Sequence, residues 1–447
     1  MMKKPALERL AQRQIQLVMT YAPAGLGHLR VTDALYHALP DIVNPIILGS
    51  QDRSIQTFHR ITSINPLLRD IFEWFQSGPL SSWSSRVYRA QLRSSAGLVH
   101  EQLVNLLDER LEPPEEILVV STHFGLAHKL AAIKERLQKE RQIKVFLAVV
   151  VTDATFQHIW YVDGADLIVV PSHSVKAKYA AYGRSLGAAE RIEVLPYPLR
   201  LDLSTQLAAA ELTKKIAQLD PTTQEPIRVS LPVSGAAVGT DYYLQIIEDL
   251  RQKSDRFIFH VVSKNAPYTN GFLSKLKDKS GVELDVADAD RVVVDAYDDV
   301  FQKHIISLEI TKPSEQAFKA LLGTHSRGGA ILLFSEPVGQ QESDNLDFLQ
   351  RHFLIPSEQT NSRLWKMADH AAAVDDASVL FDEARGWRGI RLPRQPQKAS
   401  NFIWWMLTTG IFSQMMACQA TANSKDKYPN ELGADGAAEF WNLVESV

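Results

Sequence analysis

The fold of this chain is decided near its start, by the stretch Gln16-Leu-Val-Met-Thr-Tyr-Ala-Pro-Ala-Gly-Leu-Gly-His28-Leu-Arg-Val-Thr-Asp-Ala-Leu35. The apolar run from Leu17 to Tyr21 predicts a strand, residues 22–27 predict a tight turn, and the apolar side chains that follow recur at helical spacing. Strand, turn and helix in this order form the first unit of a parallel sheet. The helix N-terminus then lies beyond the carboxyl end of the strand, where anions and polar ligands bind. His28 occupies that position.

Length and composition predict a globular protein of two domains. The chain has 447 residues, whereas single hydrophobic cores stop growing at about 250–300 residues. A net charge of −4 argues against a nucleic-acid partner that is bound through overall basicity. The single cysteine, Cys418, excludes an intramolecular disulfide and a cysteine-rich metal site. The first ten residues contain acids and bases where a signal peptide would be apolar, so we expect a cytoplasmic protein.

Strand-like and helix-like segments alternate along both halves of the chain. Candidate strands of the first half are Val43–Leu48, Ile117–Ser121, Val145–Val151, Leu167–Pro171 and Ile192–Pro196, with helices at Leu98–Leu111, Leu126–Lys139 and Val175–Arg184. Candidate strands of the second half are Ile227–Val233, Phe257–Ser263, Val292–Val294, Ile305–Ile310 and Ala330–Phe334. This alternation predicts an α/β protein with two doubly wound, Rossmann-like domains.

The domain boundary is predicted just after Arg200. Residues 1–202 form the N-terminal domain and residues 203–395 the C-terminal domain, with a helix over 203–219 at its start. Residues 396–447 supply C-terminal helices that pack back on the N-terminal domain. The apolar stretch 401–418 within them is interrupted by Thr, Ser and Gln, so we interpret it as a buried or interfacial helix rather than a membrane span. Two such domains facing one interdomain cleft favour a ligand in that cleft.

Residues 51–97 break the regular pattern, because arginines and aromatic residues are interleaved there. Two interpretations stay open. Basic and aromatic helices are typical of a surface that lies on a membrane or contacts a lipid-like acceptor. Alternatively, two amphipathic helices pack on the sheet and turn a solvated basic face outward.

In the first half, polar residues follow apolar strands. His28 is either a general base, since imidazole has a pKa of about 6.5, or an ordinary polar residue in a first helical turn. Asp153 follows the strand 145–151 and either belongs to a site or caps a turn, while His158 and Trp160 are equally compatible with packing. The histidines of this half lack metal-ligand spacing with a carboxylate, so we expect no metal.

Two further strand ends in the second half carry polar turns. Thr311-Lys-Pro-Ser-Glu315 leads from a strand into a helix, whose free N–H groups are suited to a diphosphate without a metal ion. Gly339-Gln-Gln-Glu-Ser-Asp-Asn345 follows the next strand, and its amides can bind a ribose, a sugar or a phosphate. Each is also compatible with an ordinary βα loop. Asp288-Ala-Asp290 is interpreted as an exposed turn rather than a metal site.

Together, these motifs resemble one known family. Their order is Gly-x-Gly-His28, Val-Thr-Asp153, Leu-Pro-Tyr-Pro-Leu-Arg200, Ser234-Gly-x3-Gly239, Ser-Lys-Asn265, Thr-Lys-Pro-Ser314 and Gly-Gln-Gln-Glu-x2-Asn345. Residues 15 to 355 thereby resemble the GT-B glycosyltransferases of the monogalactosyldiacylglycerol synthase and MurG type. The resemblance implies inverting transfer of a sugar from a UDP-sugar, held by the second domain, to a lipid-like, diacylglycerol-type acceptor held by the first. It also implies an enzyme on the inner face of the cell membrane, with the UDP-sugar as substrate and no cofactor.

The resemblance carries roles over to individual residues. His28 would deprotonate or orient the acceptor hydroxyl, with Gly27, Asp153 and His158 on the acceptor side. Donor-binding residues would be Ser234, Gly235, Gly239, Thr240, Asn265, Tyr297, Thr311, Lys312, Pro313, Ser314, Glu315, Gln340, Gln341 and Asn345. Among these, Gly235 and Gly239 would admit the diphosphate, Tyr297 would lie in the loop that caps the base, residues 311–315 would hold phosphate, and Gln340 and Gln341 would contact the sugar with Asn345 behind them.

The chain departs from the family pattern at several positions. The family's Gly-Gly-Gly run is here Ser234-Gly-Ala-Ala, its Gly before Lys-Asn is Ser263, and its Thr-Lys-Pro-Gly-Gly is Thr311-Lys-Pro-Ser-Glu315. One more departure falls on a position with a functional role. The acidic residue thought to bind the donor ribose aligns with Lys319 or Ala320. Either Glu315 replaces it, or the donor differs, or activity has been lost. Two alternatives to a transferase therefore stand beside it: a catalytically silent GT-B scaffold that binds a nucleotide or a partner, and an epimerase that acts on a nucleotide sugar alone.

Overall fold

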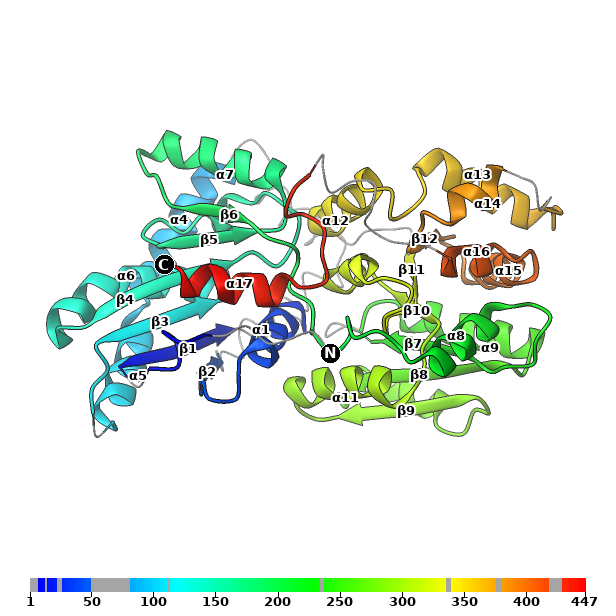
Figure 1. The fold of residues 1–447 in the computed structure, drawn as a ribbon, viewed down its shortest axis with the longest axis horizontal. Coiled ribbons are helices and arrows are strands. Elements are labelled where there is room, and N and C mark those ends of the chain that lie inside the picture. The colour runs from blue at the N-terminus through cyan, green and yellow to red at the C-terminus, as the bar shows by residue number, and fades with distance from the viewer. Residues whose placement is uncertain are drawn as a thin grey trace. The chain divides into compact units, whose positions relative to one another are not determined.

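The computed structural model describes residues 7–12, 14–21, 26–49, 81–110, 112–233, 237–334, 339–374, 379–417 and 428–447 (Figure 1). They belong to two compact units. We call residues 202–427 the C-terminal unit, and the residues up to 201 together with 428–447 the N-terminal unit. Each unit is built around its own sheet.

The sheet of the N-terminal unit has six parallel strands in the order β2-β1-β3-β4-β5-β6. Their bounds are β1 Ile15–Tyr21, β2 Ile46–Gly49, β3 Glu116–Ser121, β4 Lys144–Val150, β5 Leu167–Val170 and β6 Ile192–Val194. The central strands are almost wholly apolar, because a parallel sheet is covered on both faces. Val18, Val119 and Val149 are accordingly fully buried.

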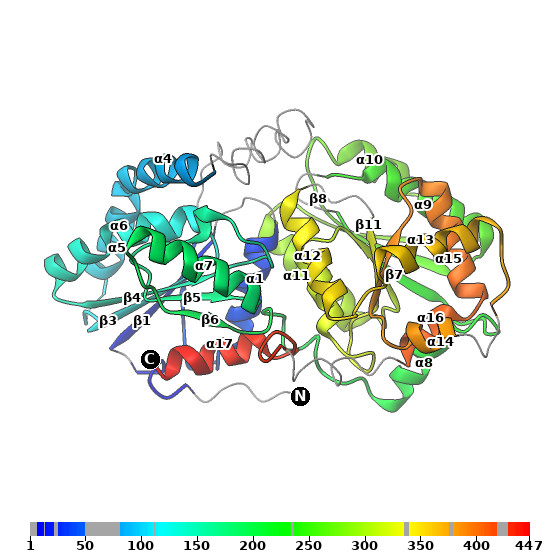
Figure 2. The ribbon, with the colours of Figure 1, turned by 90° about the horizontal axis from the view of Figure 1, so that it is seen from above.

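Helices cover both faces of this sheet. They are α1 Leu26–Ala38, α4 Ser81–Ser94, α5 Gly97–Asp108, α6 Phe124–Arg141, α7 His173–Leu186 and α17 Gly436–Glu445, with the short 3-10 helix η1 His158–Trp160. Figure 2 shows α4 and α6 on one face and α17 on the other. α17 packs on α1, where the indole N–H of Trp441 donates to the carbonyl of Leu35 at 2.7 Å. α17 thereby completes the core of the N-terminal unit.

The C-terminal unit contains a second sheet of six parallel strands, in the order β12-β11-β10-β7-β8-β9. The bounds are β7 Ile227–Pro232, β8 Phe257–Lys264, β9 Val282–Ala287, β10 Leu308–Thr311, β11 Ala330–Phe334 and β12 Gly389–Leu392. Counted from β7, this is the Rossmann strand order, in which the chain reverses its direction of progress between the first and fourth strands.

The helices of the C-terminal unit are α8 Ala209–Leu219, α9 Thr240–Lys253, α10 Asn270–Leu276, α11 Asp290–Lys303, α12 Gln340–Arg351, α13 Glu358–Asp369, α14 Val379–Ala384, α15 Pro396–Thr408 and α16 Ile411–Met416, with the 3-10 helix η2 Glu315–Leu321. α15 packs between α9 and α13, which Figure 2 shows together at one side of the sheet. α11 packs on β8 and β9.

The predicted architecture of two doubly wound, Rossmann-like α/β domains is confirmed by these sheets. The predicted strand at 292–294 is wrong, since these residues lie in α11. Three successive valines favour a strand by propensity, yet Val293 and Val294 are buried on the same helical face as Tyr297 and Phe301. The predicted helix over 203–219 begins only at Ala209.

The C-terminal helices differ from the prediction that residues 396–447 return to the N-terminal domain. α15 and α16 belong to the C-terminal unit, and α17 alone of the described helices in this range belongs to the N-terminal unit. The apolar stretch is also broken in two, because Gly410 adopts a left-handed conformation with φ of 78°. Of the helices in the described part of the chain, none combines the length and hydropathy that a membrane crossing requires.

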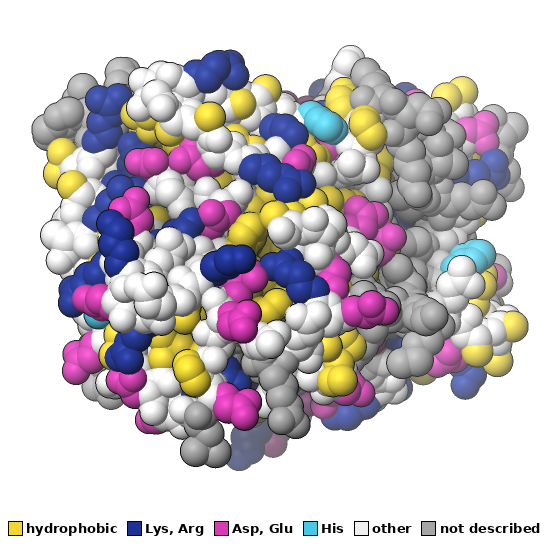
Figure 3. All heavy atoms as spheres, turned by 60° about the vertical axis from the view of Figure 1, so that its left-hand side comes forward, with side chains coloured by type: hydrophobic (Ala, Val, Ile, Leu, Met, Phe, Trp, Pro, Cys, Tyr) yellow, Lys and Arg dark blue, Asp and Glu magenta, His cyan; other side chains and the backbone are white. Residues whose placement is uncertain are grey.

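Residues 51–80 of the arginine- and aromatic-rich segment lie outside the described residues. Its remainder forms α4 and the start of α5. Arg89, one of the arginines of this segment, is buried and donates to the hydroxyl of Tyr182 at 2.6 Å. Basic and acidic side chains are interspersed over the face shown in Figure 3, in keeping with the near-neutral net charge.

Lys215 of α8 holds the loop between η2 and β11 by hydrogen bonds to its backbone carbonyls. Its buried ammonium donates to the carbonyls of Thr324 at 2.9 Å and Ser326 at 2.7 Å, and to that of Gly328. Substitution of Lys215 by methionine should lower the free energy of unfolding by about 3 kcal/mol or more, because buried carbonyls lose their donor. Chemical denaturation measures this change.

Lys214 is the matched control, because it is exposed on the same helix. Lys214→Met should change the free energy of unfolding by less than about 0.5 kcal/mol. Equal destabilisation by the two substitutions would contradict a special role for the buried ammonium.

Candidate functional site

Polar side chains meet at the carboxyl edge of the N-terminal sheet. The strand order reverses between β1 and β3, and ligands of open α/β sheets bind at such a switch point. His28 lies in the first turn of α1, which follows β1. Thr122 and His123 follow β3, and Thr152 and Asp153 follow β4. Three neighbouring strand ends therefore supply one group of side chains.

His28 is oriented through Thr152. The Nδ1 atom of His28 lies 3.1 Å from the hydroxyl of Thr152, which in turn donates to the Asp153 carboxylate at 3.4 Å. A hydroxyl that gives its proton to the carboxylate accepts from Nδ1–H of the imidazole. The lone pair of His28 is then on Nε2, as a general base requires.

The backbone of His28 is fixed as well. Its carbonyl accepts from the hydroxyl of Thr32 at 2.9 Å and from that of Thr122 at 3.1 Å, and these two hydroxyls lie 2.7 Å apart. Thr122 is fully buried. The start of α1 is thus tied to the end of β3, so the imidazole projects from a rigid part of the fold.

Aromatic rings border the His28 imidazole. The ring of His123 meets it edge-on at 5.0 Å, and Trp160 lies 5.8 Å away. Phe124 stacks on His123 and contacts Trp160, joining the rings into one wall. His28 is half-buried while Trp160 is almost fully buried, which leaves part of the imidazole accessible beside an apolar surface.

His158 has a different environment. Its ring packs at 4.4 Å from Tyr182 and 4.9 Å from Phe156. Burial, and secondarily the nearby Arg89, lower the pKa of His158. The packing interpretation fits these contacts. Gly27, the other predicted acceptor-side residue, precedes His28 within α1.

The corresponding switch point of the C-terminal sheet lies between β7 and β10. Gly239 caps α9 after β7 with φ of 85°, a conformation that strains any residue with a Cβ atom. A Cβ atom there would also lie 2.8 Å from the Phe334 ring at the end of β11. Thr240 begins α9. Because Gly239 has no Cβ atom, its backbone and the Phe334 ring can lie close together at this edge.

The loop after β10 is tied to α12. Lys312 pairs with Glu342 at 2.7 Å, with both side chains largely buried, and the amide of Asn345 donates to the carbonyl of Pro313 at 3.2 Å. The hydroxyl of Thr311 donates to the side chain of Gln316 at 3.1 Å. Asn345 was predicted to support Gln340 and Gln341, and in the structure its amide holds the backbone of Pro313.

Tyr297 lies within α11 rather than in a loop, and it is buried. Its hydroxyl donates to Glu309 of β10 at 2.6 Å, and Glu309 also pairs with Lys319 at 2.5 Å. The Lys319 ammonium lies 4.1 Å from the centre of the Tyr297 ring and 4.4 Å from that of Phe301. Lys319, one of the two residues aligned with the expected ribose-binding position, is thus part of a buried ion pair.

The other predicted donor residues are spread along the same sheet edge. The amide of Gln340 donates to Asp344 at 2.7 Å on the exposed side of α12, and Gln341 follows it in that helix. The amide of Asn265, after β8, donates to Asp288 at 2.8 Å. Ser314 caps η2 and Glu315 begins it, so a seven-residue 3-10 helix stands where an α-helix was predicted. Ser234 and Gly235 lie outside the described residues.

Sequence analysis missed three residues that organise these regions: Thr122, Glu309 and Glu342. Thr122 directly follows a predicted strand, and this position at a strand end could have identified it as a site residue. Glu309 lies within an otherwise apolar strand, and a charge there indicates a buried partner. The partner of Glu342 lies thirty residues earlier and had no local signal.

No protein-family model and no curated protein matches the chain at a significant level. Similar solved structures include S. aureus MnaA with UDP, at 11% identity and a TM-score of 0.46 over 96% of each chain. Arabidopsis thaliana UGT89C1 with UDP-L-rhamnose has 12% identity and a TM-score of 0.45 over 97% of this chain and 98% of that one. UDP-GlcNAc 2-epimerase from Neisseria meningitidis, bound to UDP-GlcNAc, has 11% identity and a TM-score of 0.41 over 96% and 99%. At such identities, function has to be argued from the residues of this chain.

The Glu309–Lys319 pair has a testable energetic consequence. Lys319→Met should lower the free energy of unfolding by about 3–5 kcal/mol, because it leaves the Glu309 charge buried without a counter-ion. The double substitution Glu309→Gln/Lys319→Met should recover most of the loss, since a neutral amide still accepts from Tyr297. Urea unfolding of the two variants measures both effects, and equal destabilisation of single and double variants would contradict the pairing.

Proposed function

We propose that this chain is an inverting glycosyltransferase that uses a UDP-sugar. The observation that carries the proposal is the Asp153–Thr152–His28 series at the switch point of the N-terminal sheet, because it orients an accessible imidazole as a base. The C-terminal unit holds the donor. The identity of the nucleotide as UDP follows the resemblance to enzymes of the monogalactosyldiacylglycerol synthase and MurG type.

The proposed chemistry is a single displacement. Nε2 of His28 takes the proton of an acceptor hydroxyl, and the oxygen attacks the anomeric carbon of the sugar. The bond from that carbon to the diphosphate breaks on the opposite side, so the configuration inverts and UDP leaves with the electron pair. Asp153 stabilises the resulting imidazolium through Thr152, in the way a carboxylate supports a catalytic histidine.

Several features of the C-terminal unit support a diphosphate ligand. α9 and α12 start at the carboxyl edge of the sheet, and the N-termini of such helices favour anions. Gly239 keeps the start of α9 free of a Cβ atom. Lys312 supplies a cation at the end of β10, where it is balanced by Glu342. No metal ion or cofactor is part of the proposal.

A second function, nucleotide binding without turnover, is favoured by one observation. Neither Lys319 nor Ala320 carries a carboxylate, and both are buried, with Lys319 engaged by Glu309. A site without that carboxylate binds the donor more weakly, because two hydroxyl hydrogen bonds are lost. Glu315, at the start of η2, is then the acidic residue placed to replace it.

Initial rates with a panel of UDP-sugars, with and without a diacylglycerol acceptor, test the proposal. His28→Ala should lower kcat by about 10²–10⁴-fold because it removes the base. Thr152→Val should lower kcat by a smaller factor and shift its pH dependence, because the imidazole loses its orienting hydroxyl. His173→Ala, on an exposed position of α7, is the matched control and should leave the rate unchanged.

Other outcomes of these measurements distinguish the alternative functions. UDP binding in calorimetry without turnover supports the silent scaffold, and a changed sugar without acceptor supports an epimerase. If the His28→Ala variant retains wild-type activity, the assignment of His28 is wrong. If neither UDP nor any UDP-sugar binds, the proposal as a whole fails.

A lipid-like acceptor is the finer part of the proposal. α4 supports it by exposing two adjacent large apolar side chains, Val87 and Tyr88, next to Arg86. The protein should float with vesicles of anionic and neutral phospholipids, and Val87→Ser/Tyr88→Ser should lose most of this binding, because apolar side chains anchor an interfacial helix. Ile216→Ser, at a similarly exposed position on α8, is the control. Absence of wild-type flotation would contradict membrane contact.

A further inference from the structure

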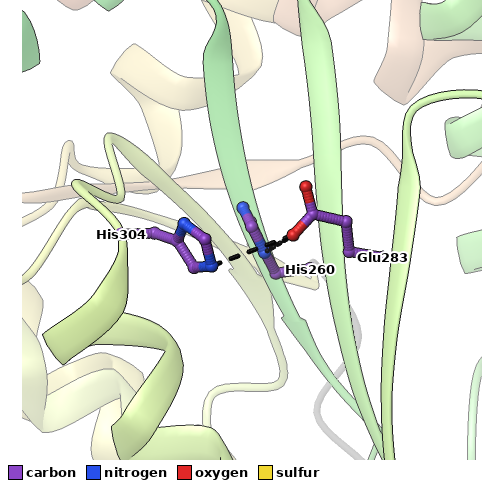
Figure 4. Close-up of side chains that lie close together, drawn as sticks. All are labelled: His260, Glu283 and His304. Carbon is purple, nitrogen blue, oxygen red and sulfur yellow. Dashed lines mark ion pairs between the residues drawn. The ribbon is translucent and has the colours of Figure 1, made fainter.

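Three side chains with metal-binding atoms converge in the C-terminal unit, away from the residues discussed above (Figure 4). They are His260 of β8, Glu283 of β9 and His304, which follows the last residue of α11. The register of β8 and β9 sets His260 directly beside Glu283. α11 packs across these strands and ends beside them, which brings in His304. Three elements therefore supply one cluster.

The distances are close to those of a coordination shell. Nδ1 of His260 lies 3.1 Å from Oε2 of Glu283, and Nε2 of His304 lies 3.8 Å from the same oxygen. All three ligand atoms lie within 4.8 Å of one another. Metal–ligand bonds of about 2.0–2.2 Å in a tetrahedral site place ligand atoms roughly 3.4 Å apart. Movements of roughly 1 Å or less would complete such a site.

The buried nitrogen of His260 faces the Glu283 carboxylate. Nδ1 of His260 is inaccessible to solvent and makes no hydrogen bond to any described residue, although the carboxylate is near. Figure 4 shows the two imidazoles and the carboxylate directed toward one another. Glu283 and His304 are partly exposed, which gives an ion a route from solvent. A cation at the common point would bind the buried nitrogen and the carboxylate together.

His260 is wholly buried, and the centre of its ring lies 4.3 Å from that of His304. Around His304 lie the cations Arg228 and Lys303 and the carboxylates of Glu283 and Asp285. Imidazole lone pairs together with a carboxylate suit a divalent cation.

Arg228 competes with a metal ion for His260, so its substitution has a predictable effect on metal affinity. Its Nη1 atom lies 3.0 Å from Nε2 of His260 and 3.7 Å from Oε1 of Glu283. An imidazole bound to metal through Nδ1 carries its proton on Nε2 and no longer accepts from a guanidinium. The partly exposed Arg228 side chain must then turn toward solvent. Removal of the guanidinium should therefore tighten metal binding.

We propose that His260, Glu283 and His304 form a site for a divalent transition metal, with Zn²⁺ the preferred ion. Two imidazoles and one carboxylate select zinc over magnesium and calcium, which prefer all-oxygen ligands. Three protein ligands leave a fourth position for water. The ion would clip the edge strand β9 and the end of α11 to β8. This site is independent of the proposed sugar transfer, since none of its residues belongs to that machinery.

The test is metal titration of the full chain, without a histidine tag and after treatment with a chelator. Zn²⁺ in competition with a chromophoric chelator should bind with one-to-one stoichiometry, and Co²⁺ should give the visible absorption of a nitrogen- and oxygen-ligated tetrahedral site. Glu283→Gln and His304→Ala should each weaken binding by more than about a hundredfold, because loss of a ligand costs more than the roughly tenfold to hundredfold loss caused by removing an outer-shell partner. His370→Ala, an exposed histidine on α13's C-cap, is the control and should bind as wild type does.

Arg228→Met keeps all three ligands and should bind Zn²⁺ more tightly than the wild type. Thermal unfolding without metal checks that each variant is folded. Absence of one-to-one binding by the wild type overturns the site. Equal affinity of wild type, Glu283→Gln and His304→Ala overturns it too. If any ligand variant fails to fold, Arg228→Met decides: tighter binding supports the site, and unchanged or weaker binding contradicts it.

Discussion

A constraint of parallel sheets governs both halves of this chain. Where the strand order reverses, the connections on either side leave toward opposite faces, and the ends of the two central strands stay uncovered between them. The reversal lies between β1 and β3 in one sheet and between β7 and β10 in the other. His28 follows the first of these strands, and Gly239 follows β7. The strand order of each sheet therefore determines that these two residues lie at a switch point.

The second constraint is the cost of charge inside the C-terminal core. Glu309 is wholly buried on a central strand, so it needs a cation, a donor and a polarisable surface, which Lys319, Tyr297 and Phe301 supply. Lys319 is one of the two residues at which a carboxylate was expected to face a ribose. Its ammonium is engaged in the core instead.

The sequence was sufficient to predict what depends on local pattern. Apolar runs bounded by turns located most strands, and the position of His28 after the first strand placed it at the sheet edge. The prediction of a strand at 292–294 was wrong, because β-branched residues dominate that run, while Tyr297 and Phe301, which share its buried helical face, come three to eight residues later. β12 was missed, since it is only four residues long and pairs with β11 far earlier in the chain. The pairs Lys312–Glu342 and Glu309–Lys319 depend on three-dimensional packing and have no one-dimensional period.

The histidines show why residue type alone does not assign function. His128 is fully buried, its ring nitrogen contacts the carbonyl of Ile159, and burial lowers its pKa to about 3, so it acts as a neutral packing residue. His28 has a hydroxyl and a carboxylate behind it and an accessible side, which is the environment of a base. His260 has a buried nitrogen that faces a carboxylate and a second imidazole, which is the environment of a metal ligand. The three histidines differ in burial, in partner and in access, and only the folded chain determines these three quantities.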